Sequence, residues 1–364
     1  MRTWNDIYDS SDKILKCILE QTEEENGRSD CSDMLNERLR NQLQYDPFQA
    51  YRKLKRRRQR RLMRWCSVAA GIVLLVGLAW GWWQGQADRE AVLAETICPG
   101  HKKAVLSLAD GSVWYIGDTA MTIPTAREDI RVDSNGLSLR VRNGVERSDD
   151  EVYHLLTIPR GGEFAMTLPD GSRVWLNSGS ELRFPLQFAA KQRKVILMGE
   201  AYFEVKEDTT RPFVVEMNES RIEVLGTSFN VRFYRDEGRV VTTLVEGKVR
   251  FETANAQMIL KPGEQSVLNE KGQLQKQMVD VYPYIAWKEG RFIFRKQRLE
   301  DIMAIVSRWY NVEIRFQDEE SKEMTFSGGM MRYEGFEALV KMVETIGSVV
   351  CNIENDTVFI AKRK

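Results

Sequence analysis

The segment Ser67–Trp83 restricts what this chain can form more than any other feature. It reads SVAAGIVLLVGLAWGWW and contains no charged residue. With a rise of ~1.5 Å per residue, a helix of this length reaches about 26 Å, which is the short end of a membrane span. Tryptophans cluster at its C-terminal end, where indole rings favour the lipid headgroup region. We therefore expect one transmembrane helix over residues 65–84.

The charges on either side of this segment predict its direction. Arg89, beyond the span, stands between Asp88 and Glu90. Basic residues close to a span remain in the cytoplasm, so we expect the N-terminus inside and the rest of the chain outside. The basic residues that precede the span are Arg52, Lys53, Lys55, Arg56, Arg57, Arg58, Arg60, Arg61 and Arg64.

Three other interpretations of this region are weaker. A buried core helix can be equally apolar, but it is not usually preceded by a basic tract and followed by tryptophans. A cleaved signal peptide would find a weak cleavage site at Gly85-Gln86-Ala87, but signal peptides do not carry 64 residues before the apolar part. The basic tract lacks the interleaved aromatic residues of a nucleic-acid site, so we expect no direct nucleic-acid binding.

Residues 1–64 contain two short helical patterns. Each pattern follows potential N-caps, Ser10 to Asp12 for the first and Ser32 and Asp33 for the second. Isolated helices of this length are marginal in water, so their apolar faces favour folding on a partner. A small self-contained helical bundle is the alternative. The apolar positions are Ile14, Leu15, Ile18, Leu19, Leu35, Leu39 and Leu43.

Between residues 85 and 282 the helical period gives way to alternation. Two stretches, LSLADGSVWYI at 106–116 and MTLPDGSRVWL at 166–176, each place an Asp-Gly turn between apolar runs. This pattern predicts a hairpin, and the two copies form an internal repeat. Further short apolar runs are separated by glycines. We expect an all-β domain, either a sandwich or a solenoid.

Residues 283–364 predict a separate small domain. Apolar residues recur at helical spacing over 299–309 and 336–343, with the second helix ending at Gly347. Alternating stretches precede, separate and follow these helices. The predicted order is β-α-β-β-α-β-β, an α+β domain.

The chain resembles the FecR family over nearly its whole length. The blocks at 287–294 (WKEGRFIF) and 299–316 resemble the C-terminal module of Bacteroidetes FecR proteins and the secretin and TonB N-terminal fold. The blocks similar to the FecR periplasmic domain are RGGEF (160–164), LPDGSRVWLNSGSELRFP (168–185), RKVILMGEAYFEV (193–205), PFVV (212–215), EVLGTSFNVR (223–232), TLVEGKV (243–249) and LKPGEQSVL (260–268).

The resemblance implies a transmembrane anti-sigma factor in a bacterial inner membrane, with its C-terminus in the periplasm. Residues 1–64 would sequester an extracytoplasmic-function (ECF) sigma factor through the seven apolar residues named above. The periplasmic part would receive a signal from a TonB-dependent outer-membrane receptor, contacted by the C-terminal module. That module could instead simply cap the β-rich domain.

Two patterns suggest chemistry, and each has a plainer explanation. Asp170, Glu181, Glu200 and Glu204 could be paired catalytic carboxylates, but Asp170 is a turn residue and the others suit strand ends, so we expect no enzyme activity. Some FecR-like proteins cleave themselves at a Gly-Thr bond that matches Gly226-Thr227, through attack of the threonine hydroxyl on the preceding carbonyl. The alternative is a turn glycine followed by a β-favouring threonine.

Cysteine and histidine usage predicts neither metal nor cofactor. The five cysteines show no zinc-site spacing, and the two histidines are isolated. Cys98 and Cys351 lie outside the predicted membrane segment, where they could form a disulfide or remain as separate thiols.

Two other functional classes remain open at this point. One is a membrane-anchored periplasmic structural or carbohydrate-binding β protein, which would not need amphipathic helices before the span. The other is an enzyme that acts on envelope polysaccharide, which would need clustered carboxylates at Glu200 or Glu204.

Overall fold

The structure is a computed structural model that describes residues 97–125, 128–133, 136–141 and 152–363. All of these residues belong to one unit of the chain, Gly85–Lys364. The predicted cytoplasmic segment and the predicted span at 65–84 lie outside the described residues. Within the described ranges, no helix is both long and apolar enough to cross a membrane.

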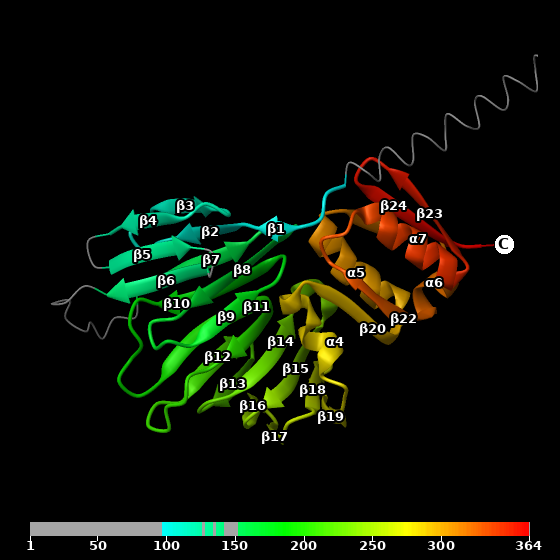
Figure 1. Ribbon diagram of the computed structural model, residues 1–364. Coiled ribbons are helices and arrows are strands. Elements are labelled where there is room, and N and C mark those ends of the chain that lie inside the picture. Colours follow the sequence, from blue (N-terminus) through cyan, green and yellow to red (C-terminus); the bar gives the residue numbers. More distant parts are fainter. Residues whose placement is uncertain (1–96, 126–127, 134–135, 142–151, 364) are drawn as a thin grey trace, which may run out of the picture. The chain divides into compact units, whose positions relative to one another are not determined.

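The first part of this unit, which we call the β domain, consists of strands and one short 3₁₀ turn (Figure 1). The elements are β1 (His101–Lys102), β2 (Ala104–Ser107), β3 (Val113–Ile116), β4 (Met121–Pro124), β5 (Glu128–Asp133), β6 (Gly136–Val141), β7 (Tyr153–Ile158), β8 (Gly162–Thr167), β9 (Arg173–Leu176), β10 (Ser180–Pro185), β11 (Arg193–Glu204), β12 (Phe213–Met217), β13 (Ser220–Val224), β14 (Ser228–Phe233), η1 (Arg235–Glu237), β15 (Arg239–Glu246), β16 (Val249–Thr253), β17 (Gln257–Leu260), β18 (Glu264–Asn269) and β19 (Leu274–Met278).

These strands form two sheets that share β11. The first sheet has the order β3-β2-β7-β10-β11-β12-β13-β16-β17. The second has the order β4-β5-β6-β8-β9-β11-β14-β15-β18-β19. From β12 onward, successive hairpins alternate between the two sheets. Of the two predicted architectures, the structure therefore shows a sandwich, assembled hairpin by hairpin.

Strand β11 joins the sheets because it bends at Gly199. Residues before the bend pair with β10 and β12 in the first sheet, and residues from Gly199 onward pair with β9 and β14 in the second. Gly199 has φ +102°, and a Cβ there would lie 2.6 Å from the Cα of Ser180. Only glycine can occupy such a position without strain.

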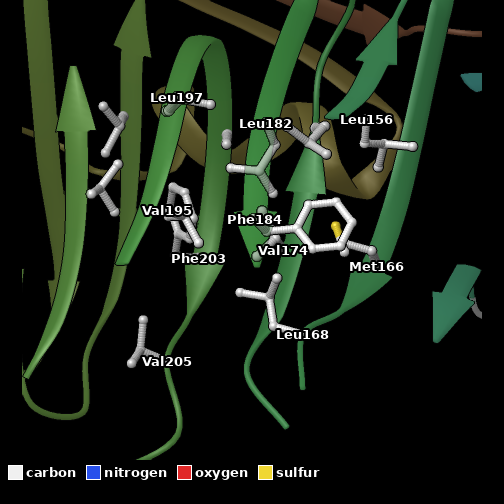
Figure 2. Close-up of a cluster of buried hydrophobic side chains, with 14 of the residues drawn as sticks. Leu156, Met166, Leu168, Val174, Leu182, Phe184, Val195, Leu197, Phe203 and Val205 are labelled. Atoms are coloured by element: carbon white, nitrogen blue, oxygen red, sulfur yellow. The ribbon is translucent and has the colours of Figure 1, made fainter. Parts of the chain in front are cut away.

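The core of the β domain lies between the two sheets. Burial alternates along the strands, as in β7 and β8, so one face of each sheet is apolar. Figure 2 shows Leu182 and Val195 of the first sheet together with Met166, Val174 and Phe203 of the second. Stacking of Phe203 on Phe229, with ring centroids 5.1 Å apart, ties neighbouring strands of the second sheet.

The two copies of the predicted repeat form the same turn, so this prediction is confirmed. In the β2–β3 hairpin the amide of Gly111 donates to Leu108 O at 3.0 Å, and in the β8–β9 hairpin Gly171 donates to Leu168 O at 2.9 Å. The aspartate before each glycine accepts a hydrogen bond from the amide of the following serine. One copy lies in each sheet.

The second part of the unit, which we call the C-terminal module, is an α+β domain. The linker that leads into it contains α4 (Tyr282–Ile285) and η2 (Ala286–Glu289). The module consists of β20 (Arg291–Arg298), α5 (Leu299–Tyr310), β21 (Glu313–Phe316), α6 (Glu319–Glu323), β22 (Thr325–Met331), α7 (Phe336–Gly347), β23 (Val349–Glu354) and β24 (Thr357–Lys362). Strands β20 and β22 form one sheet, and β21-β24-β23 form another.

Apolar faces of α5 and α7 meet these strands in one core. Leu299, Ile302 and Val306 of α5 and Leu339 and Val343 of α7 are buried there. The predicted spacing of apolar residues in both helices is confirmed, because positions i, i+3 and i+4 share one face of a helix.

The structure differs from the sequence-based order in a few elements. The short helix α6 was not predicted; the Asp318 carboxylate caps it by accepting from the Ser321 amide at 2.8 Å. The predicted end of the second helix at Gly347 is confirmed, and the next residue, Ser348, adopts the left-handed conformation with φ +50°. A Cβ at position 347 would collide with the Phe326 ring. Strands β4 to β7 were also not predicted.

Candidate functional site

All seven predicted sigma-factor contact residues precede the part of the chain that the structure describes. Ile14, Leu15, Ile18, Leu19, Leu35, Leu39 and Leu43 lie outside the described residues. The predictions about sigma-factor binding therefore stay predictions. The described residues contain the predicted Gly-Thr bond, the four carboxylates and the contact between the β domain and the C-terminal module.

The Gly226–Thr227 bond is packed between two other segments. Thr227 is buried; its hydroxyl donates to Lys248 O at 3.1 Å, and its carbonyl accepts from the Val205 amide at 3.0 Å. A Cβ on Gly247 would lie 2.8 Å from both the Gly226 carbonyl oxygen and the Thr227 hydroxyl. Gly247 thus packs closely against both groups, with no space for a side chain.

Gly226 does not have the positive φ of a typical turn glycine. It lies in a bend between β13 and β14, and a Cβ there would lie 2.8 Å from the Glu207 Cα. Close approach of the backbone, rather than φ, requires glycine at this position.

The four carboxylates are dispersed, and two of them form buried polar interactions. Asp170 pairs with the buried Arg193 guanidinium at 2.8 Å. Glu204 ends β11 and Glu181 lies near the start of β10, as expected for strand ends. Glu200 corrects the prediction, because it lies within β11 and is only 5% exposed.

Glu200 is the centre of a buried polar cluster on the second sheet. Its carboxylate accepts hydrogen bonds from the Asn177 amide at 2.9 Å, the Asn230 amide at 3.1 Å and the Arg232 guanidinium at 3.0 Å. Arg232 also forms a bidentate pair with Glu237 in η1. The Glu200 carboxylate and the Arg232 guanidinium thus each have an oppositely charged partner within the β domain, as buried charges require.

From this cluster, hydrogen bonds continue into the module. The Trp287 indole N–H donates to Asn230 Oδ1 at 3.2 Å, and Arg332 Nη2 donates to Asn177 Oδ1 at 2.8 Å. We call the contact between the β domain and the module the junction. Both asparagines therefore link Glu200 to side chains that follow the β domain in sequence.

Arg332 is the most buried charge of the junction. Its side chain is 0% exposed, and its guanidinium stacks 3.8 Å from the Trp309 ring centroid. It donates to Glu163 at 3.0 Å and to Trp287 O at 2.9 Å. Burial lowers the pKa of Arg332, and the Glu163 carboxylate opposes this shift. The Tyr333 hydroxyl donates to the same carboxylate.

Arg308 of α5 makes a second ionic contact across the junction. Its guanidinium stacks 3.8 Å from the Tyr234 ring centroid and donates to Glu237 and Asp236, each at 2.7 Å. Burial raises the pKa of Glu237, but the guanidiniums of Arg232 and Arg308 lower it more, so the net pKa lies below the ordinary value of 4.5. Burial also raises the pKa of the Tyr234 hydroxyl, which donates to Ser178 O.

Backbone groups of the 159–162 turn close the junction. The Gly161 amide donates to Arg308 O at 2.7 Å, and the Arg160 guanidinium donates to Ser307 O and Val312 O, both at 2.8 Å. These interactions satisfy carbonyls at the C-terminal end of α5, where a cation is favourable. The two domains are therefore joined by specific polar contacts rather than by a loose linker.

A cavity of about 550 Å³ lies along the junction, between the outer face of the second sheet and the linker with β20. The buried amide of Gln265 lines this cavity; it donates to Thr243 at 2.8 Å and accepts from Gln277 at 2.9 Å. Among the described residues, no group of three or more His, Cys, Asp or Glu side chains could hold a metal ion.

Sequence reasoning missed the junction because its residues are distant along the chain. Glu163 lies in the block RGGEF and Arg332 lies 169 positions later. A recognisable signal was the tryptophan pair, Trp287 and Trp309, in a domain with otherwise ordinary helices. Tryptophan and arginine are enriched at interfaces.

Cys98 and Cys351 are not joined to each other by a disulfide. Cys98 is exposed, whereas Cys351 is buried in the core of the module. Burial, with the nearby Glu344 carboxylate, raises the pKa of the Cys351 thiol to about 12, so the thiol is unreactive at neutral pH.

Comparison with known proteins identifies both domains. Residues 154–250 match the family described as FecR protein, and residues 291–360 match the family described as FecR, C-terminal. The first match falls within the sandwich, and the second covers the module up to β24. The chain therefore contains regions that match the FecR domain and the FecR C-terminal domain, in the predicted order.

Solved structures of a related protein agree with this assignment. A protein from Parabacteroides distasonis ATCC 8503, provisionally assigned as an anti-sigma factor, has a crystal structure at 1.65 Å that matches with a TM-score of 0.55 and 27% identity. That match covers 58% of this chain and 99% of the other. A second structure at 2.50 Å gives a TM-score of 0.54 and 28% identity, covering 58% and 100%. No curated protein sequence matches the chain.

Proposed function

We propose that this protein is a single-pass inner-membrane anti-sigma factor, a regulator of transcription rather than an enzyme. The observation that carries the proposal is the pair of FecR domains in order, together with the likeness to a provisionally assigned anti-sigma factor along 99% of the chain in its crystal structure. The basic-flanked apolar segment supports the membrane location.

On this proposal, residues 1–64 bind an ECF sigma factor in the cytoplasm. The two amphipathic patterns supply apolar faces that would fold against the sigma factor. Ile14, Leu15, Ile18 and Leu19 would form one face, and the leucines at 35, 39 and 43 would form the other.

The periplasmic unit would receive the signal of a TonB-dependent outer-membrane receptor through the C-terminal module. The junction supports such a relay, because Arg332 and Arg308 tie the module to the β domain by buried contacts. A force or shift at the module is therefore transmitted to the second sheet and to Glu200. Packed polar interfaces of this kind have discrete arrangements rather than continuous ones.

The test of the proposal uses the full chain and its own bacterium. Deletion of the gene should raise transcription from promoters of one ECF sigma factor, and the tagged full chain should co-purify with that same sigma factor. Replacing Leu35, Leu39 and Leu43 by aspartate should abolish co-purification and raise transcription as the deletion does, while membrane levels of the chain stay constant. Unchanged transcription after deletion of residues 1–50 would instead favour a structural role.

We also propose that the Gly226–Thr227 bond is cleaved in some molecules. The Thr227 hydroxyl oxygen would attack the Gly226 carbonyl carbon, the C–N bond would break to leave an ester and a free amine on Thr227, and water would then hydrolyse the ester. The close packing of Gly247 against both groups, with the burial of Thr227, supports this step because it restricts the conformations that the hydroxyl can adopt.

An immunoblot against the C-terminus tests this cleavage. We expect a fragment that begins at Thr227, that is lost in Thr227→Val, and that persists in Thr227→Ser, which keeps a hydroxyl. Only full-length protein in the parent and in all variants would contradict the proposal without affecting the anti-sigma role.

A further inference from the structure

Strand β21 forms one edge of the three-stranded sheet of the module. It pairs with β24 in parallel on one side, and the sheet ends there in the order β21-β24-β23. An edge strand presents backbone N–H and C=O groups that can pair with another strand.

The direction of the backbone groups along β21 determines where an additional strand could pair with it. The amides of Glu313 and Gln317 donate toward β24, to Asp356 O and Ile360 O, each at 2.8 Å. Because backbone groups alternate along a strand, those of Ile314 and Phe316 point to the outer edge. Val312 O already accepts from Arg160 at 2.8 Å, so the accessible edge is short and centred on Ile314.

A groove of about 870 Å³ runs beside this edge. It is lined by Met303, Ala304 and Ser307 of α5 and by Ile314 and Phe316 of β21. Both β21 side chains are half-buried, and Ala304 and Ser307 on the α5 side of the groove are small. A helix beside an open strand, with an apolar floor between them, is an arrangement that accepts an additional strand.

The two residues that flank Ile314 carry opposite charges, so an antiparallel copy of the strand would bring opposite charges together. Glu313 and Arg315 lie on the exposed face of β21, each 59% exposed, and pair with each other at 3.0 Å. If a second β21 runs antiparallel about a two-fold axis at Ile314, Glu313 faces Arg315 of the partner subunit, and the reverse pair forms on the other side. The edge therefore matches a copy of itself.

The hydrogen-bond pattern agrees with this register. The two Ile314 residues would exchange both backbone hydrogen bonds, so the glutamate–arginine pairs fall at non-hydrogen-bonded positions. There the Cα atoms of opposite residues are only about 4.5 Å apart and the side chains are closest. Opposite charges directly across such a pair are favourable, and like charges are unfavourable.

We propose that β21 is a self-association edge, through which two copies of this chain form a symmetric dimer with their module sheets continuous across the two-fold axis. The interface is isologous, as in most dimers. Because the ladder is short, the dimer is weak and depends on both charge pairs. The proposal does not rest on the anti-sigma role.

Co-purification of two differently tagged full-length chains from the same cells tests the dimer. The parent chain should capture its copy. Glu313→Arg should not capture itself, because two arginines would then face two arginines, and Arg315→Glu should fail for the matching reason. We expect each to reduce recovery about ten-fold or more.

Expressing the two variants together tests whether the β21 edge pairs with a copy of itself. Glu313→Arg expressed with Arg315→Glu should recover co-purification, and the double variant E313R/R315E should capture itself, because opposite charges again face each other. If the single variants still capture themselves, if the parent does not, or if mixing restores nothing, the edge does not pair with itself and the proposal is overturned.

Discussion

At the scale of single residues, the junction concentrates its free energy in a few buried charges. Arg332 is enclosed by Trp309, Glu163, Asn177 and Trp287, and its Nε has no hydrogen-bond partner among the described residues. Desolvation of a buried guanidinium is costly. Arg332 therefore contributes to stability by providing hydrogen bonds to its buried neighbours as much as by its attraction to Glu163. Its removal takes the cation from Glu163 and one hydrogen-bond donor each from Asn177 and the Trp287 carbonyl.

We predict that Arg332→Met lowers the free energy of unfolding of the Gly85–Lys364 unit by about 3 kcal/mol or more, because Glu163 is left without its buried cation. Chemical denaturation followed by tryptophan fluorescence measures this loss. Arg295→Met is the matched control: Arg295 pairs with Asp280 at 2.8 Å but is 63% exposed, so less than about 1 kcal/mol is expected. Equal losses in both variants would contradict a special role for Arg332.

At the scale of elements, β11 determines how the sandwich closes. One strand contributes to both sheets, and the change occurs at a single glycine. The bend brings Glu200 to the outer face of the second sheet, next to Asn177 and Asn230. The position of the polar cluster therefore depends on the conformation of Gly199.

We predict that Gly199→Ala destabilises the unit by about 2 kcal/mol or more, because alanine disfavours φ +102° and its Cβ would meet the Ser180 backbone. Gly272→Ala is the control, since Gly272 has φ +72° but open space within 4 Å; about 1 kcal/mol is expected from the φ strain alone. Thermal melting of both variants compares the two costs. If the Gly199→Ala protein is as stable as the Gly272→Ala protein, the bend in β11 does not require glycine at position 199 and the prediction is wrong.

At the scale of the whole described unit, the β domain and the module are linked through ionised groups. Glu237 lies in the β domain and contacts Arg308 of the module. Its folded pKa is depressed, so the unfolded chain takes up this proton more readily than the folded chain. Its contribution to stability is thus fully present above its unfolded pKa of about 4.5 and is lost as the pH falls through the folded value.

We therefore predict that the melting temperature falls as the pH is lowered from 6 to 3, and that Glu237→Gln reduces this dependence. Differential scanning calorimetry at several pH values measures both profiles. In the variant, stability at pH 6 should already be lower, and the two curves should converge in acid. Parallel curves would show that other carboxylates dominate the acid response.

Much of the fold could be predicted from local patterns. The Asp-Gly hairpins appear at both copies of the repeat because a turn needs only its own few residues. The helices at Leu299 and Phe336 follow from apolar spacing, which is also a local property. Of the site, the sequence indicated the Gly226–Thr227 bond and the carboxylates, but it placed Glu200 at a strand end rather than inside β11.

By itself, the sequence determined the apolar segment, the order of elements in the module and the two FecR domains, because periodicity, turn chemistry and motif order are encoded by neighbouring residues. Only the tertiary structure decided the sandwich, the bend that places Glu200 on the outer face, and the enclosure of Arg332 by Glu163 and Trp309. The contact between Glu163 and Arg332 joins residues 169 positions apart, and the low exposure that gives it its energy exists only after both domains have packed.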